Sequence, residues 1–213
     1  MADTEHTPAP DGAGAETAPV KHRPKPGERR VQILQTLAAM LQQPGGERIT
    51  TAALARQLQV SEAALYRHFA SKAQMFEGLI DFIEQSVFAL INQIEAQAHE
   101  PGHRKARQII TLLIKFAEKN PGMSRVMVGD ALVLEHERLQ QRMNLFFDKI
   151  EAALKQCLRT DTANADSATP TQDAQVSAML LTSFARGRLQ RYVRSDFKRP
   201  ASEQLEACLA RVL

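Results

Sequence analysis

The chain has 213 residues, of which 44% are hydrophobic, 5% are aromatic and none is tryptophan. This length suits one medium domain or a small domain joined to a larger body, and the shortage of aromatic residues favours helix-on-helix packing over a β-sandwich. The two cysteines, Cys157 and Cys208, lie far apart, which argues against a disulfide framework or a zinc site. No apolar run has the length of a membrane span and no signal-peptide pattern is present, so a cytoplasmic protein is expected.

The basic residues are concentrated in one part of the chain. The net charge is +3, but nine Lys or Arg residues and only three acids lie between Lys21 and Lys72, whereas residues 1–20 contain four acids and no Lys or Arg. A basic segment joined to a near-neutral body is typical of a protein that binds nucleic acid at one end. Charge by itself leaves a merely solvated basic surface as the alternative.

The N-terminal part predicts a tail followed by a helix. Residues 1–26 are rich in Pro, Ala, Gly and Thr and lack apolar periodicity, which predicts disorder. The basic end of this region, Lys21–Arg30, is a candidate arm for DNA phosphates or a minor groove. A first helix is expected at Glu28–Gln42 and is ended by Pro44-Gly45-Gly46; its apolar stripe is Val31, Ile33, Leu34, Leu37, Ala38 and Leu41.

Two short helices and a long one come next. Thr50 or Thr51 is expected to cap a second helix that stops near Gln59-Val60, and Ser61 to cap a third. Ser71 is expected to cap a fourth helix from Lys72 to about Gln97. Further helices are expected at residues 104–119, 123–131, 132–160, 174–195 and 202–212, with a polar loop at 161–172. Because no segment has a persuasive strand pattern, the predicted fold class is all-α.

The segment Ile49–Phe69 has the layout of a helix-turn-helix, in which the second short helix lies in the major groove and the first supports it. Ala63 and Ala64 are small enough for the backbone to approach a duplex, and the start of the helix at Ser61 offers free N–H groups to a phosphate. Nearby donors complete the candidate set of DNA contacts, which is Thr50, Thr51, Ser61, Ala63, Ala64, Tyr66, Arg67, His68 and Lys72.

Two features of this segment complicate that interpretation. Short helix pairs are common, so periodicity and charge together do not establish DNA binding. Glu62 opposes binding by its charge unless it faces outward or accepts a hydrogen bond from cytosine. The apolar residues are expected to form the small core of the domain: Leu54, Leu58, Val60, Leu65 and Phe69.

The same stretch resembles the helix-turn-helix of the TetR-type family. The resemblance is carried by five features, which are Leu54-Ala55, Val60-Ser61, Leu65-Tyr66, His68-Phe69 and Lys72, while Gln59 departs from the glycine usual before the valine. It implies a dimer with an N-terminal three-helix DNA-binding domain at 27–72, which reads the two half-sites of a palindrome, and a helical dimerisation and partner-binding body at 73–213. It also implies the DNA contacts named above.

Within this family, a closer resemblance to nucleoid occlusion factors covers roughly Arg29 to Pro200. It rests on the runs RITTAALA, VSEAALYRHFASKAQMFEGLIDFIE, KNPGMSRVM, ALVLEHERLQQRMNLFFDKIEAAL and GRLQRYVRSDFKRP. The resemblance implies a protein that binds palindromic sites on the nucleoid and antagonises assembly of the division protein FtsZ. The FtsZ-binding residues that it implies are Phe82, Leu113, Lys119 and Asn120, with burial in the core as the alternative for Phe82.

The dimer is expected to form through the last two long helices, two from each subunit. The candidate interface residues are Phe146, Phe147, Ile150, Leu154, Leu180, Leu181, Phe184, Leu189 and Tyr192. Burial in the core of a single subunit is the competing interpretation for each of them.

No catalytic motif is evident, so we expect neither an enzyme nor a cofactor. Glu135-His136-Glu137 is better explained as a solvated helix face than as a metal site, and no phosphate-binding glycine loop or nucleophile elbow is present. Two other functions are compatible with the sequence. One is a ligand-responsive TetR-type transcriptional repressor, which needs a pocket in the body, and the other is a nucleoid-coating protein without sequence preference.

Overall fold

The computed structural model describes residues 27–44, 48–164 and 168–213, and these residues form helices joined by short connections. The expected tail at 1–26 lies outside the described residues. The helices are α1 (Glu28–Gln42), α2 (Thr51–Gln57), α3 (Glu62–Tyr66), α4 (Lys72–Glu95), α5 (Gly102–Lys119), α6 (Pro121–Met127), the 3₁₀ turn η1 (Asp130–Leu132), α7 (Glu137–Asn164), α8 (Pro170–Arg194) and α9 (Leu205–Val212). No strand occurs in these described ranges, and the all-α prediction is confirmed.

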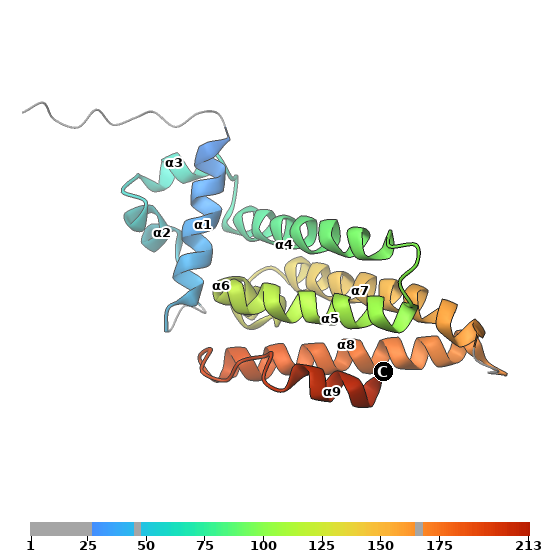
Figure 1. The fold of residues 1–213 in the computed structure, drawn as a ribbon. Coiled ribbons are helices and arrows are strands. Elements are labelled where there is room, and N and C mark those ends of the chain that lie inside the picture. The colour runs from blue at the N-terminus through green and yellow to red at the C-terminus, as the bar shows by residue number, and fades with distance from the viewer. Residues whose placement is uncertain (1–26, 45–47, 165–167) are drawn as a thin grey trace, which may run out of the picture.

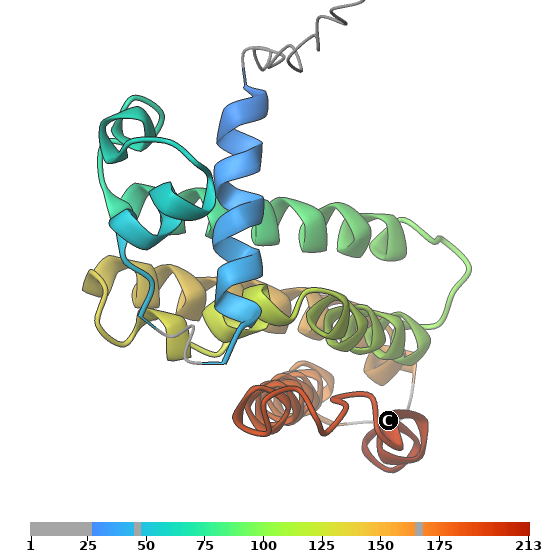
Figure 2. The same cartoon turned by 90° about the vertical axis from the view of Figure 1, so that its left-hand side faces the viewer.

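The body is a stack of long helices with the three N-terminal helices at one end. Figure 1 shows α4, α5 and α8 extending in the same general direction in successive layers, while α1 lies across their ends. In the second view, α2 and α3 lie beside α1, away from α8 and α9 (Figure 2). The most extensive helix contact joins α7 to α8. The buried apolar side chains of the N-terminal helices and of the body belong to one continuous core.

The N-terminal helices are attached to the body by the packing of α1 against α6. A Cβ atom added to Gly122 of α6 would lie 1.9 Å from the carbonyl oxygen of Ala38 in α1. Only glycine allows two backbones to approach so closely. This contact fixes the position of α1, and with it the position of the helix-turn-helix, relative to the body.

Several predicted helix boundaries are wrong. The short helix starts at Pro121, where proline suits the first helical turn, instead of Met123. The long helix begins at Glu137 instead of Leu132, because Gly129 in a left-handed conformation (φ 87°) leads into η1 and a connection. Val133 and Leu134 extended the apolar pattern in the sequence, yet their side chains are 76% and 71% exposed.

Two further expectations are corrected by the structure. The loop predicted at 161–172 is helical at both ends, since α7 continues to Asn164 and α8 begins at Pro170, and its residues 165–167 lie outside the described part. In α1, Ile33, Leu37 and Leu41 are buried as predicted, but Val31 is 53% exposed. Within the described ranges, the helices are too short or too polar to cross a membrane.

Candidate nucleic-acid interface

The turn of the helix-turn-helix is built by local hydrogen bonds around Gln59. The backbone N–H of Gln59 donates to the carbonyl oxygen of Arg56 (3.0 Å), and that of Val60 donates to the carbonyl oxygen of Ala55 (3.0 Å). These two bonds form a Schellman motif, which requires a left-handed residue after the helix. Gln59 adopts that conformation with φ 54°, although glycine is the residue that adopts it without strain.

Both short helices begin with side-chain caps. The Thr50 hydroxyl accepts a hydrogen bond from the N–H of Ala53 at 3.1 Å, and the Ser61 hydroxyl accepts one from the N–H of Ala64 at 3.2 Å. Each cap occupies one of the N–H groups that a helix leaves without partners at its start. The sequence predicted the Ser61 cap, because the capping pattern is local, but it left Thr50 and Thr51 as alternatives, and the structure assigns that cap to Thr50.

All nine candidate DNA contacts lie at the surface or are half-buried. Tyr66 is 44% exposed, and Ser61, Ala63 and Arg67 are also exposed, whereas Leu65 of the same helix is 1% exposed and holds it to the core. Helix α3 therefore turns one apolar side toward the protein and presents its polar and small side chains to solvent. This is the arrangement that a recognition helix requires.

Glu62 neither points freely outward nor remains without a partner. The Thr51 hydroxyl donates to a Glu62 carboxylate oxygen at 2.6 Å, and the Tyr66 hydroxyl lies 3.5 Å from the same Thr51 oxygen. This chain of contacts joins the start of α2 to both ends of α3. The charge that seemed to oppose DNA binding thus takes part in fixing the angle between the two short helices.

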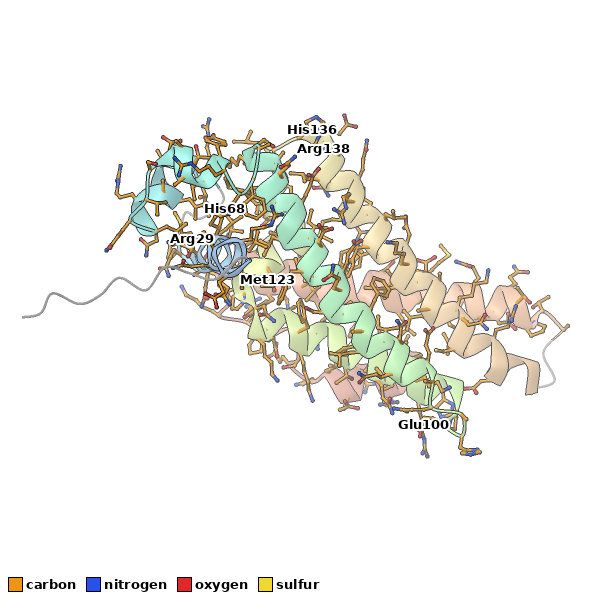
Figure 3. All side chains as sticks on the ribbon, turned by 90° about the horizontal axis from the view of Figure 1, so that it is seen from above. Arg29, His68, Glu100, Met123, His136 and Arg138 are labelled. Atoms are coloured by element: carbon orange, nitrogen blue, oxygen red, sulfur yellow. The ribbon has the colours of Figure 1, made fainter. Side chains whose placement is uncertain are left out.

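Lys72 is the one candidate contact that is paired with a carboxylate of the body. Its ammonium group forms an ion pair with Glu135, in the connection before α7, and it also lies 5.7 Å from the centre of the Phe76 ring. Two further ion pairs join α7 to α4 nearby: Arg138 pairs with Glu77 at 2.7 Å, and Arg142 pairs with Asp81 at 2.8 Å. Figure 3 shows His136 and Arg138 beside the first turns of α4.

The residues suggested for binding FtsZ fall into two groups. Phe82 is 48% exposed on α4, while Lys119 and Asn120 line an open hollow of about 240 Å³ between the end of α5 and α1. Leu113 is wrong as a surface contact, because its side chain is completely buried. The neighbouring Leu112 is only half-buried, and the sequence did not distinguish the two leucines.

Most of the residues suggested for the dimer interface are buried within one subunit. At most 5% of the side chain is exposed for seven of the nine, which pack where α7 meets α8 and are Phe146, Phe147, Ile150, Leu154, Leu181, Leu189 and Tyr192. As surface contacts these seven are wrong. Leu180 is 57% exposed and Phe184 is half-buried, so these two reach the surface.

Other exposed apolar residues of α7 and α8 were not predicted from the sequence. Leu145, Val176 and Met179 are 51%, 50% and 50% exposed. Val176, Leu180 and Phe184 follow a four-residue spacing, which places them on one face of α8. Gly187 continues that face, and a Cβ atom added there would have nothing within 4 Å. The spacing was available in the sequence, but the apolar residues of the buried face obscured it.

Comparisons with known proteins agree with this architecture. Residues 33–79 match the family described as bacterial regulatory proteins, tetR family, and residues 103–210 match the SlmA-like family described as tetracyclin repressor-like, C-terminal domain. Among solved structures, a TetR transcriptional regulator from Legionella pneumophila superimposes with a TM-score of 0.69 at 16% identity, covering 90% of this chain and all of that chain. The regulator FadR from Bacillus halodurans superimposes with a TM-score of 0.70 at 14% identity, covering 89% of this chain and 97% of its own. At such identities the likeness shows the fold.

The relatives in sequence extend over the body as well. Nucleoid occlusion factor SlmA from Colwellia psychrerythraea is 50% identical over 176 residues, covering 82% of this chain and 88% of the relative. The SlmA of Idiomarina loihiensis is 50% identical over 84% of this chain and 90% of its own length, and that of Vibrio vulnificus is 48% identical over 85% and 92%. The chain therefore belongs to the SlmA family of nucleoid occlusion factors, within the TetR-type DNA-binding regulators.

Proposed function

We propose that this chain is a DNA-activated inhibitor of division-ring assembly. Its dimer binds palindromic duplex sites through the two copies of α3, and the bodies then engage FtsZ, so that no septum forms over the nucleoid. The observation that carries the proposal is that the likeness to nucleoid occlusion factors includes the body, at residues 103–210, as well as the helix-turn-helix. The protein is therefore expected on the nucleoid wherever the chromosome contains these palindromic sites.

The geometry of the helix-turn-helix supports the nine candidate DNA contacts. Arg67 and His68 lie in the turn directly after α3, and Lys72 lies at the start of α4, so their side chains are suited to contact phosphates on either side of the groove. A phosphate near Lys72 would compete with Glu135 for the ammonium group. DNA binding at this position is therefore expected to weaken the contact between the start of α4 and the connection before α7.

The exposed part of the suggested FtsZ surface consists of Phe82 and the Lys119–Asn120 corner. Phe82 offers an apolar side chain on α4, and Lys119 offers a positive charge beside a hollow that the α1 residues Gln35 and Ala38 also line. We expect FtsZ to meet Phe82 with an apolar side chain and Lys119 with an acidic one. Because the hollow contains residues of α1, its shape depends on how the DNA-binding end is seated on the body.

The test is FtsZ polymerisation, measured by light scattering, with the purified full-length protein. The DNA is a palindromic duplex that the wild-type protein selects from a random pool, and the control DNA has the same composition with scrambled half-sites. Stronger inhibition with the selected duplex than with the scrambled one is expected. Tight binding of the duplex with no effect on FtsZ would contradict the proposal and would favour a transcriptional repressor.

Substitution of Phe82 separates the two activities. Phe82→Ala is expected to leave duplex affinity and thermal stability close to wild type and to weaken the FtsZ effect by about tenfold or more, as for a central contact residue. Leu134→Ala is the matched control, since it removes an even more exposed apolar side chain from the connection before α7. An equal loss of FtsZ inhibition in both variants, or unfolding of Phe82→Ala, would show that Phe82 is not an FtsZ contact.

A further inference from the structure

Arg30 connects the first helix to the turn that follows the recognition helix. Its guanidinium group donates a hydrogen bond to the carbonyl oxygen of His68, which is 38 positions later in the chain. The same group lies over the Phe69 ring, with its central carbon 4.1 Å from the ring centre. Figure 3 shows His68 close to the first turns of α1, where Arg29 is labelled.

This double contact acts on a part of the fold with little stability of its own. Helix α3 has only five residues, and so short a helix depends on tertiary contacts for its orientation. The His68 carbonyl lies two residues beyond the end of α3, close to the negative end of the helix dipole, where a positively charged donor is favoured. Phe69 is 1% exposed and anchors this end in the core. Arg30 therefore braces the end of the segment that carries Arg67 and His68.

We infer that Arg30 is a positioning residue for DNA recognition and does not serve as a phosphate-binding part of the basic N-terminal arm. The inference rests on the proposed role of α3 in sequence-specific binding. Arginine suits this position because its planar group stacks on a ring and donates a directed hydrogen bond at the same time. The sequence had grouped Arg30 with the arm Lys21–Arg30, since its contact with His68 depends on the tertiary fold.

The neighbouring arginine provides a matched control. The guanidinium group of Arg29 donates to the side-chain oxygen of Gln32 at 2.8 Å, entirely within α1. Arg29→Met and Arg30→Met each remove one positive charge from adjacent positions, but only the second removes the brace from α3. Arg30→Lys retains the charge and loses the planar group that stacks on Phe69.

The experiment measures the affinity of each full-length variant for the selected palindromic duplex and for its scrambled control over a range of salt concentrations. For Arg30→Met we expect about tenfold weaker binding to the palindrome, binding to the scrambled duplex within about twofold of wild type, and an unchanged salt slope. Arg30→Lys is expected to resemble Arg30→Met, and Arg29→Met to discriminate between the duplexes as wild type does. Hydrogen exchange of the backbone amides at 62–69 should become faster in Arg30→Met and in Arg30→Lys, but not in Arg29→Met.

Other outcomes would overturn the inference. A salt slope reduced by about one, with equal loss on both duplexes and rescue by lysine, would identify Arg30 as a phosphate contact. Unchanged discrimination by Arg30→Met would exclude any positioning role. If Arg30→Met unfolds the helix-turn-helix, the test rests on Arg30→Lys. The inference is then rejected if Arg30→Lys discriminates between the palindrome and the scrambled duplex as the wild-type protein does. If the wild-type protein itself binds both duplexes equally, the proposed sequence-specific function fails instead.

Discussion

At the scale of single residues, Gln59 shows that the turn of the helix-turn-helix contains backbone strain. Its φ of 54° lies in the left-handed region, where a side chain costs about 1–2 kcal/mol relative to glycine. Gln59→Gly is therefore expected to raise the free energy of unfolding by roughly 0.5–1 kcal/mol, because part of the gain is offset by the greater freedom of glycine in the unfolded chain. Denaturant unfolding followed by circular dichroism measures this change. A less stable Gln59→Gly protein would show that the turn is not strained.

Asp161 supplies the cap that α5 lacks locally. Pro101 at the start of α5 makes no side-chain cap, and the Asp161 carboxylate accepts hydrogen bonds from the N–H groups of Gly102 and His103 and lies 2.7 Å from the His103 ring nitrogen. Burial raises the pKa of Asp161, but these hydrogen bonds and the nearby His103 ring outweigh burial, so the pKa lies below its usual value.

This depressed pKa predicts a pH dependence of stability. A carboxylate whose pKa is lower in the folded state stabilises the protein above its unfolded pKa of about 3.9, and the stabilisation is lost as the pH falls through the lower, folded value. Asp161→Ala should thus reduce the free energy of unfolding at pH 7 by roughly 1 kcal/mol, as for loss of a helix cap. Chemical unfolding from pH 7 into the acid range should show the wild-type advantage shrinking. A deficit that stays constant down to about pH 2 would contradict this account.

At the scale of helices, the approach of α6 to α1 determines how the DNA-binding end is mounted. A methyl group at position 122 would collide with the carbonyl oxygen of Ala38, so Gly122→Ala must separate the two helices. We expect a loss of stability of about 2 kcal/mol or more and weaker binding of a palindromic duplex, since the two recognition helices would no longer keep their spacing. Differential scanning calorimetry and duplex binding measure the two effects.

Gly187 is the control for the stability effect alone, because it lies on the face of α8 where we expect the second subunit. It is also a helical glycine, but a Cβ atom added there would meet nothing within 4 Å in a single subunit. Gly187→Ala should therefore leave the stability of the subunit unchanged or slightly higher. Equal destabilisation by Gly122→Ala and Gly187→Ala would show that the cost comes from something other than the contact with Ala38.

At the scale of the whole molecule, the exposed face of α8 is where we expect the second subunit. Leu180 has the most exposed large apolar side chain on this helix, and replacing it with Glu would place a charge in the dimer interface. Leu180→Glu should weaken dimerisation by roughly thirtyfold or more and reduce affinity for a palindrome, because a monomer reaches only one half-site. Light scattering after size-exclusion chromatography measures the mass. Leu134→Glu is the control, and a dimeric Leu180→Glu would place the interface elsewhere.

The sequence by itself determined the all-α class, the limits of α1, the cap at Ser61, and the family. These features follow from helical periodicity, capping and motif spacing, which involve residues near each other in the chain.

Only the tertiary structure decided which apolar residues are covered. Leu180 and Leu181 are adjacent and equally apolar, but Leu180 is 57% exposed and Leu181 is fully buried. In the same way, Leu112 is half-buried and its neighbour Leu113 is fully buried. The tertiary structure also formed the contact of Arg30 with His68, and the sequence had no signal for it. A helix with apolar residues on more than one side does not specify which neighbour will cover each side, because burial depends on the packing of segments that are distant in the chain.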